Sequence, residues 1–203
     1  MQYFRQAVAM VVTDEQRQRN EEFLNICIKD SLGNRLRRWT LLPCAPYDWN
    51  DDEHFYAAFT CIEPNVEAMS KRKTGVDTVV WHDDCVEVFI SAGPDLFPYR
   101  QFEANAIDTR FDSNWFARKK MDGSWNATWN SRAAIGKDRW ICEIAIPWRD
   151  IGSAPAPGDQ RRGNLTRHRI PHEEETTTWT PMYKTFSDAE YMATWVFEAA
   201  GQR

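Results

Sequence analysis

Hydrophobic and polar positions alternate with a period of two along several segments of the chain, which is the pattern of β-strands that bury one face. The segments are residues 55–62, 83–91, 101–107 and 139–148. In the first of them, Phe55, Ala57, Phe59 and Cys61 fall on one face. Turns rich in glycine, proline or aspartate separate the segments. The pattern predicts an all-β fold, a two-sheet antiparallel β-sandwich of the immunoglobulin or jelly-roll kind.

The N-terminal region carries the one helix signal. After a strand-like stretch at residues 7–12, Thr13 and Gln16 fit the S/T-x-x-E/Q capping box, which predicts a short helix over roughly residues 14–24. The apolar stretch at residues 1–12 is too short and too interrupted for a signal peptide or a membrane span. There is no internal repeat and no long linker, so we expect a single domain over residues 1–203.

Composition narrows the classes of ligand. The chain has ten Trp, and an indole offers the flat apolar face and polar edge on which a pyranose ring can stack, although most of the ten are expected in the core. The net charge of −5 argues against a nucleic-acid partner, and the basic run at residues 161–169 is expected in a solvated loop and strand edge. Five Cys without a CxxC pair predict neither a zinc site nor a disulfide framework.

Polar side chains lie opposite the apolar stripe on three of the predicted strands. They are Glu87 on one strand, Gln101, Glu103 and Asn105 on the next, and Glu143 on a third. One face of each sheet in a sandwich meets water, so a polar outer row is expected in any case. Carboxylates and amides also present donors and acceptors in a fixed plane, which suits the bridging of vicinal hydroxyls. These residues are therefore candidates for a carbohydrate-binding site.

Five segments resemble, in the family's order, motifs of family 9 carbohydrate-binding modules and of the family 9-like proteins. They are W-x-x-D-x-V-E-h-F-h at residues 81–90, Y-x-x-F-E-x-N at 99–105, W-x-x-E-h-A-I-P-W at 140–148, h-x-x-N-x-x-R around 163–167, and W-S/T-P at 179–181. The resemblance covers roughly residues 55–197. It implies a two-sheet sandwich that binds an oligo- or polysaccharide, requires no cofactor beyond a structural calcium in some members, and works in a secreted or periplasmic, hydrolase-associated polysaccharide-utilisation system.

The resemblance also implies a site. In sugar-binding members two aromatic rings clamp a terminal sugar, while a Glu and an Asn bond its hydroxyls. The first ring falls on Trp81, the Glu on Glu87 and the Asn on Asn105. The second ring falls in residues 182–191, on Phe186 with Tyr183 close by. The best-known modules have Arg where this chain has Glu103, whereas the family 9-like subgroup has Glu there, so Glu103 joins the implied site.

Two other function classes stay open. A glycan-active hydrolase or lyase could use two of Glu87, Glu103 and Glu143 at a separation of about 5–10 Å. A haem-binding electron-transfer domain has the same architecture and needs an axial Met with His or Lys. The candidates for those ligands are Met69, Met121, His54 and His82, and there is no CxxCH motif. The acidic clusters at residues 48–53 and 83–84 could hold calcium or form turns.

Overall fold

The computed structural model describes residues 53–75, 77–170, 175–180 and 188–197. Its elements are, in chain order, β1 (His54–Ile62), the 3-10 turn η1 (Val66–Ala68), β2 (Cys85–Ser91), β3 (Tyr99–Asn105), β4 (Arg110–Ala117), β5 (Lys120–Asp122), β6 (Asn130–Ile135), β7 (Arg139–Pro147), α2 (Trp148–Ile151), β8 (Gln160–Arg169), β9 (Glu175–Thr178), η2 (Ala189–Tyr191) and β10 (Ala193–Val196). The strand expected at residues 7–12 and the helix expected at 14–24 lie outside the described residues. The short α-helix that the structure does describe, α2, directly follows β7.

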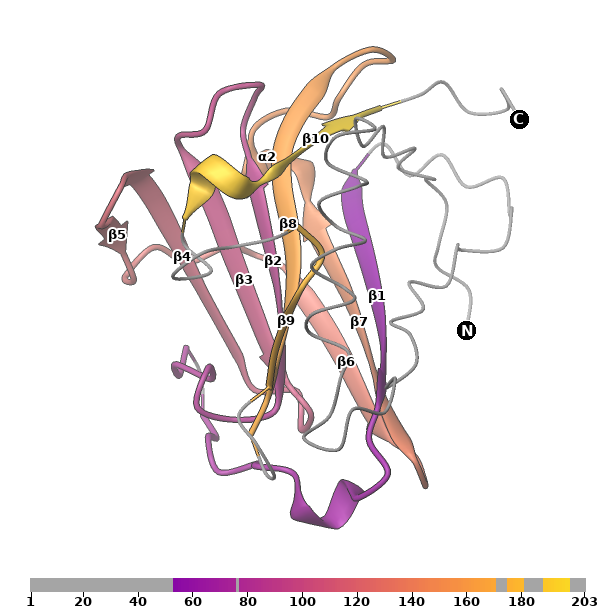
Figure 1. Cartoon of the computed structure of the whole chain (residues 1–203). Helices are drawn as coiled ribbons and strands as arrows, with labels where there is room; N and C mark the ends of the chain where they lie inside the picture. The colour runs from indigo at the N-terminus through magenta and orange to yellow at the C-terminus, as the bar shows by residue number, and fades with distance from the viewer. Residues whose placement is uncertain (1–52, 76, 171–174, 181–187, 198–203) are drawn as a thin grey trace.

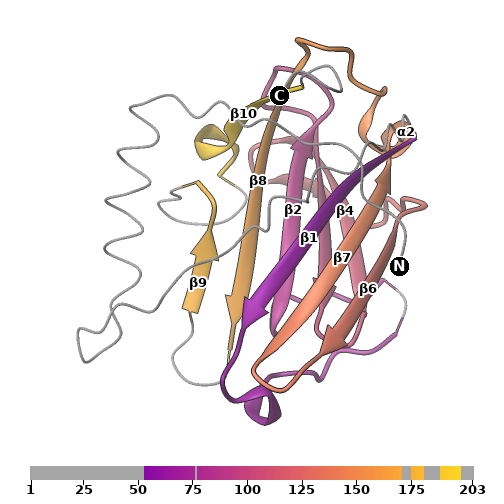
Figure 2. The same ribbon diagram turned by 90° about the vertical axis from the view of Figure 1, so that its right-hand side faces the viewer.

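The strands form two antiparallel sheets that pack face to face, which confirms the predicted sandwich (Figures 1 and 2). The smaller sheet has the order β1-β7-β6, and the larger has the order β10-β8-β2-β3-β4-β5, with β9 beside β8. Every pairing is antiparallel. The described residues therefore make one sandwich, while a single domain over the whole of 1–203 stays a prediction.

The predicted alternation places the main core correctly. Residues Phe55, Ala57, Phe59 and Cys61 of β1 are buried between the sheets, with exposed or half-buried residues between them. Strand β7 buries its even-numbered positions in the same core. Strand β2 differs, because all seven of its residues are buried. Both faces of the larger sheet are thus covered at its centre.

A second apolar cluster covers one end of the outer face of the larger sheet and explains why β2 is buried there. It consists of Phe89, Tyr99, Ala189 and Met192, with Trp115 packed against it. The turn η2 brings Ala189 over the ends of the central strands (Figure 1). The sequence predicts a water-facing outer surface here, and that expectation is wrong because a segment distant in sequence folds over it.

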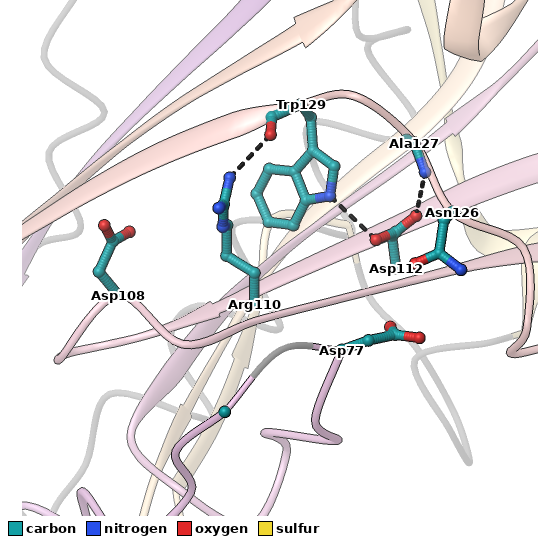
Figure 3. Close-up of a pocket in the computed structure, with 8 residues that line it drawn as sticks. Asp77, Asp108, Arg110, Asp112, Asn126, Ala127 and Trp129 are labelled. Carbon is teal, nitrogen blue, oxygen red and sulfur yellow. Dashed lines mark hydrogen bonds between the residues drawn. The ribbon is translucent and has the colours of Figure 1, made fainter.

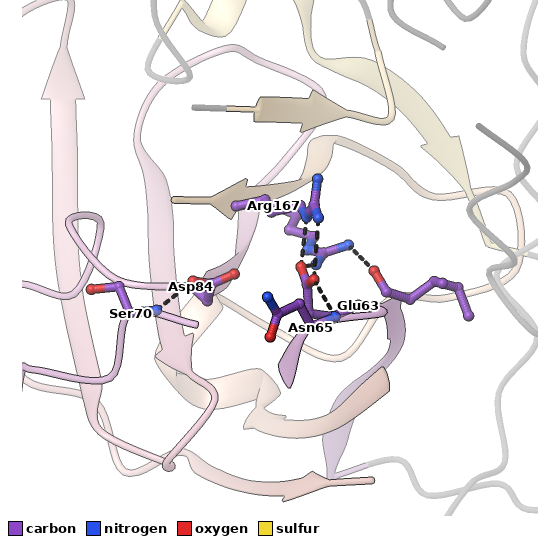
Figure 4. Close-up of polar contacts among 7 residues, drawn as sticks. Glu63, Asn65, Ser70, Asp84 and Arg167 are labelled. Carbon is purple, nitrogen blue, oxygen red and sulfur yellow. Dashed lines mark hydrogen bonds and ion pairs between the residues drawn. The ribbon is translucent and has the colours of Figure 1, made fainter. Parts of the chain in front are cut away.

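A buried ion-pair network joins the end of β1 to β8 (Figure 4). Glu63 is 0% exposed and accepts hydrogen bonds from Arg169 Nε at 2.5 Å, Arg169 Nη2 at 3.1 Å and the Asn65 N–H at 3.0 Å. Arg167 Nη2 lies 3.6 Å from the same carboxylate. Burial alone would raise the pKa of Glu63, but these hydrogen bonds and charges hold it below its usual value.

The basic run at residues 161–169 is therefore not the solvated stretch that the sequence predicts. Arg161 is 5% exposed and Arg167 is 6% exposed. Arg167 points into the sandwich, where Glu63 offers a buried counter-charge, and its Nη1 donates to the Ile62 carbonyl at 3.1 Å. Sequence reasoning assigned these cations to solvent because their acidic partner lies about a hundred residues away.

The three described cysteines, Cys61, Cys85 and Cys142, are free and buried. Burial raises the pKa of Cys61 to about 12 and raises the pKa values of Cys85 and Cys142 well above the ordinary range. These thiols act as small apolar side chains. In the described part of the chain, no helix has the length and hydropathy of a membrane span.

Candidate functional site

A row of polar side chains crosses the outer face of the larger sheet. Strand register places Phe111 of β4, Glu103 of β3, Glu87 of β2 and Thr166 of β8 side by side. Partners directly opposite each other in antiparallel strands point to the same face, so these side chains adjoin one another. Glu103 is 0% exposed and Glu87 is 1% exposed. The sequence predicts their face correctly, and the structure adds that they are buried there.

Gln101 joins the two carboxylates. Its Nε2 donates to Glu87 Oε2 at 2.8 Å and to Glu103 Oε1 at 2.7 Å. Its Oε1 accepts from Trp115 Nε1 at 2.8 Å and from Ser113 Oγ at 3.1 Å. The two donors on its oxygen fix the orientation of the amide, because the opposite orientation would place its NH₂ against the donor-only indole N–H.

The environment of the pair favours protonation. Burial raises the pKa of Glu87 to about 7, against the hydrogen bond from Gln101 that lowers it. Burial, followed by repulsion from Glu87, raises the pKa of Glu103 well above its usual value. Two carboxylates at this spacing titrate as a pair. Near neutral pH the pair therefore retains at least one proton.

Glu87 Oε1 and Glu103 Oε2 have no hydrogen bond of normal geometry, although a hydrogen bond from the Thr166 hydroxyl lowers the pKa of Glu87. His168 Nε2 lies 3.5 Å from Glu87 Oε1. The Val80 N–H lowers the pKa of Glu103 but forms no such bond with Oε2. Buried polar atoms are nearly always paired in proteins, so these oxygens are candidates for contact with a bound ligand.

Trp81 lies beside this row. Its ring is half-buried and meets the Phe111 ring edge to face, with centroids 6.0 Å apart and an interplanar angle of 81°. The centroid of the His82 ring lies 5.9 Å from the centroid of the Trp81 ring. Since Phe111 is the register partner of Glu103, the structure brings the predicted stacking residue next to the predicted carboxylates.

Asn105 stands at the end of β3 and holds the loop that leads to Trp81. Its Oδ1 accepts from the N–H groups of Ile107 and Thr109, at 3.1 and 2.8 Å. Its Nδ2 donates to the Lys73 carbonyl at 3.0 Å and to Asp83 Oδ2 at 3.1 Å. The amide is thus engaged within the protein, and its predicted bond to a sugar hydroxyl stays a prediction.

The second aromatic ring of the implied clamp falls on Tyr183 or Phe186, and both lie outside the described residues. The flanking residues are anchored on the larger sheet. The Thr180 N–H donates to Asn164 Oδ1 on β8 at 3.0 Å, and Asp188 forms an ion pair with Arg118 at 3.4 Å.

Sequence reasoning named Gln101 on this face without giving it a role, and it missed Ser113, Trp115 and Thr166. A weak signal exists for two of them. Phe111, Ser113 and Trp115 recur at every second position of β4, which places them on one face with the row. Which face of β4 points outward depends on its pairing with β3, and the local pattern does not contain that pairing.

Of the residues named for the enzyme alternative, Glu87 and Glu103 are adjacent, whereas Glu143 and the haem candidates are dispersed. Glu143 is exposed on β7 of the smaller sheet, on the far side of the core from Glu87 and Glu103, so it does not join them. Met69 is buried in the main core, whereas Met121 is exposed on β5 and His82 is exposed beside Trp81.

A calcium ion at Asp83 and Asp84 does not fit the donors around them. The Asp83 carboxylate accepts from Ser70 Oγ, from the N–H groups of Arg72 and Lys73 and from Asn105 Nδ2, at 2.7–3.1 Å. These donors lower its pKa and occupy the oxygens that a cation would need. Within the described ranges, no group of three or more His, Cys, Asp or Glu is arranged to hold a metal. Of the other acidic cluster, only Glu53 lies within those ranges.

A separate pocket of about 190 Å³ opens between the start of β4 and the residues that precede β6 (Figure 3). Asp112 accepts from Trp129 Nε1 at 3.1 Å and from the Ala127 N–H at 2.7 Å. The Arg110 guanidinium donates to the Trp129 carbonyl at 2.7 Å and lies 5.6 Å from the Trp129 ring centroid. These groups satisfy one another, whereas Asp77 Oδ1, which also lines the pocket, is buried without a hydrogen-bond partner.

The comparisons with known proteins agree with this architecture. No family model and no curated protein matches the sequence. Among solved structures, the chain is similar to a protein from Bacteroides uniformis described as carbohydrate-binding, with 18% identity, a TM-score of 0.52, and coverage of 71% of this chain and 72% of that one. It is also similar to a family 9 carbohydrate-binding module from Caldicellulosiruptor kristjanssonii in complex with cellotriose, with 11% identity, a TM-score of 0.54, and coverage of 76% and 74%.

At these identities the similarity is one of fold. The chain has the two-sheet antiparallel sandwich of family 9 carbohydrate-binding modules, and the resemblance predicted from the five motifs is confirmed at that level.

Proposed function

We propose that this domain binds carbohydrate without cleaving it, at the outer face of its larger sheet. The observation that carries the proposal is the half-buried Trp81 ring beside a row of carboxylates with unpartnered oxygens. Aromatic faces and fixed polar groups are the two components that a pyranose needs from a binding surface. The fold similarity to a module in complex with cellotriose supports the same function.

In this proposal the Trp81 ring stacks on the sugar, and Glu87 and Glu103 bond its hydroxyls. Gln101 holds the two carboxylates in position through its bonds to both. Phe186, with Tyr183 near it, would supply the second ring. Asn105 holds the loop that carries Trp81, and its direct bond to a hydroxyl would require the loss of one present contact.

Binding without cleavage follows from the environment of the carboxylates. A glycosidase places its acid and its nucleophile or base on either side of a scissile bond in an accessible cleft. Here one amide bonds to both carboxylates, so they lie side by side on one face of the sheet and not on either side of a bound glycosidic linkage. One stacked ring and a few hydroxyl bonds correspond to affinities of about −4 to −8 kcal/mol, which are millimolar to micromolar.

The test compares wild type, Trp81→Ala and Phe116→Ala on a glycan array, followed by titration calorimetry. Phe116 is 51% exposed and lies outside the row, so it is a matched aromatic control. We expect Trp81→Ala to weaken binding at least tenfold and Phe116→Ala to leave it unchanged, with melting curves to confirm that both variants fold. If Trp81→Ala binds the same glycans as tightly as wild type, the site is wrongly assigned.

A further inference from the structure

The carboxylates of Glu87 and Glu103 lie side by side on the sheet and share one amide. In the part of the chain that the structure describes, neither forms an ion pair with a lysine or an arginine. The side chains that surround them come from the central strands: Cys85 on β2, Tyr99 and Gln101 on β3, Ser113 and Trp115 on β4, and Thr166 and His168 on β8. Only His168 among them is basic, and its Nε2 is 3.5 Å from Glu87 Oε1.

One shared amide supplies too few hydrogen-bond donors for two buried carboxylates and does not neutralise their charge. Gln101 gives one hydrogen bond to each, which leaves Glu87 Oε1 and Glu103 Oε2 without a partner. A buried charge is costly unless it is paired and hydrogen-bonded. In the free protein a retained proton reduces the charge of the pair, but it supplies only one donor for several acceptor positions.

A ligand ammonium group matches this deficit. It carries one positive charge and three N–H donors. Glu87 Oε1 and Glu103 Oε2 have no hydrogen bond of normal geometry, and the Thr166 hydroxyl, whose hydrogen bond lowers the pKa of Glu87, is a further polar group next along the row. A neutral sugar hydroxyl has a single donor and leaves the charge of the pair uncompensated.

We propose that the preferred ligand of this site is an amino sugar, whose protonated amino group binds between the carboxylates of Glu87 and Glu103 while its ring stacks on Trp81. This inference rests on the proposed carbohydrate site and names the class of glycan that the site takes.

Glu87 and Glu103 are 1% and 0% exposed, so a ligand reaches them only if a neighbouring side chain moves. The side chain of His168, which touches Glu87, is 17% exposed, and Trp81 beside the row is half-buried. In the proposed complex the His168 ring moves aside to let the ammonium group reach the carboxylates. When it binds, the pair gives up at least one proton to solvent, and the N–H donors of the ligand take the place of that proton.

The first test compares ligands of equal length on the wild-type protein. Titration calorimetry at pH 6 would use β-1,4-linked oligomers of glucosamine, of N-acetylglucosamine and of glucose, each in two buffers that differ in ionisation enthalpy. We expect the glucosamine oligomer to bind at least tenfold more tightly than the other two and to release at least one proton, because a charged donor replaces a neutral one. Glucose oligomers that bind equally well or better would overturn the inference and leave the proposed function intact.

The second test uses Glu103→Gln, with Glu143→Gln on the exposed face of the smaller sheet as its control. Glu103→Gln should lower the preference for glucosamine over glucose oligomers by about tenfold. An unchanged preference would overturn the inference. If this variant does not fold, Glu87→Gln and the proton release of wild type decide the question. Failure of every oligomer to bind wild type would instead overturn the proposed function itself.

Discussion

The buried carboxylate pair predicts that the stability of this protein falls as pH rises through the neutral range. Glu87 has an ordinary pKa of 4.5 and a pKa of about 7 in the folded protein, with burial as the main cause. Between these values the folded state holds a proton that the unfolded state has lost. The free energy of unfolding therefore decreases from pH 4.5 to pH 7, and above that range the whole penalty is present.

The size of the effect follows from the two pKa values. Each pH unit between them corresponds to about 1.4 kcal/mol, so the penalty of Glu87 approaches about 3.5 kcal/mol well above pH 7, of which roughly 2–3 kcal/mol develops between pH 5 and pH 8. Glu103 acts in the same direction, because burial and repulsion from Glu87 raise its pKa too. Glu87→Gln keeps the shape of the side chain and removes its titration.

The measurement is urea unfolding, followed by tryptophan fluorescence, at pH 5 and pH 8. We expect wild type to lose roughly 2–3 kcal/mol more stability than Glu87→Gln between the two pH values, whereas Glu143→Gln should follow wild type because its side chain is exposed. Groups that do not contact the pair act on all three proteins alike, whereas Glu103 loses the repulsion from Glu87 in Glu87→Gln, so the difference reports the coupled pair. If the stability of wild type and of Glu87→Gln depends on pH in the same way, burial does not raise the pKa of Glu87 and this prediction is wrong.

Two further substitutions test packing and charge in the sandwich. A Cβ at Gly163 would lie 2.5–2.6 Å from three atoms of the buried Trp195 ring, so Gly163→Ala should lower the free energy of unfolding in urea by about 1–3 kcal/mol. Gly93→Ala is the control and should be neutral, because a Cβ there would meet open space. Equal effects of the two substitutions would contradict this packing. Glu63→Gln should lower the free energy of unfolding by about 3 kcal/mol or more, because it leaves the Arg169 guanidinium without its buried counter-charge. A loss below about 1 kcal/mol in the same assay would show that water solvates the network.

The sequence predicts the strands well where each has one buried face. In β1 and β7, alternation identifies the core side chains, because the two-residue period of a strand fixes which side chains share a face. The same rule puts Glu87 and Glu103 on the outer face of the larger sheet. It fails to predict their burial, since the period of a strand carries no information about which distant segment packs over that face.

The connections within the site could not be predicted for a related reason. Gln101 spans two carboxylates and receives Trp115 and Ser113 only because three strands pair in one particular register. Register is a property of the assembled sheet. The motifs that resemble family 9 modules located Trp81 and both glutamates but left out the amide that holds them together.

The buried thiols have a practical consequence for oxidative chemistry. Disulfide exchange and alkylation require a thiolate that a reagent can reach. Cys61, Cys85 and Cys142 are enclosed, and the pKa of each is raised, so none of them supplies that thiolate while the sandwich stays closed. Modification of these three side chains by a thiol reagent would therefore report how often the two sheets separate.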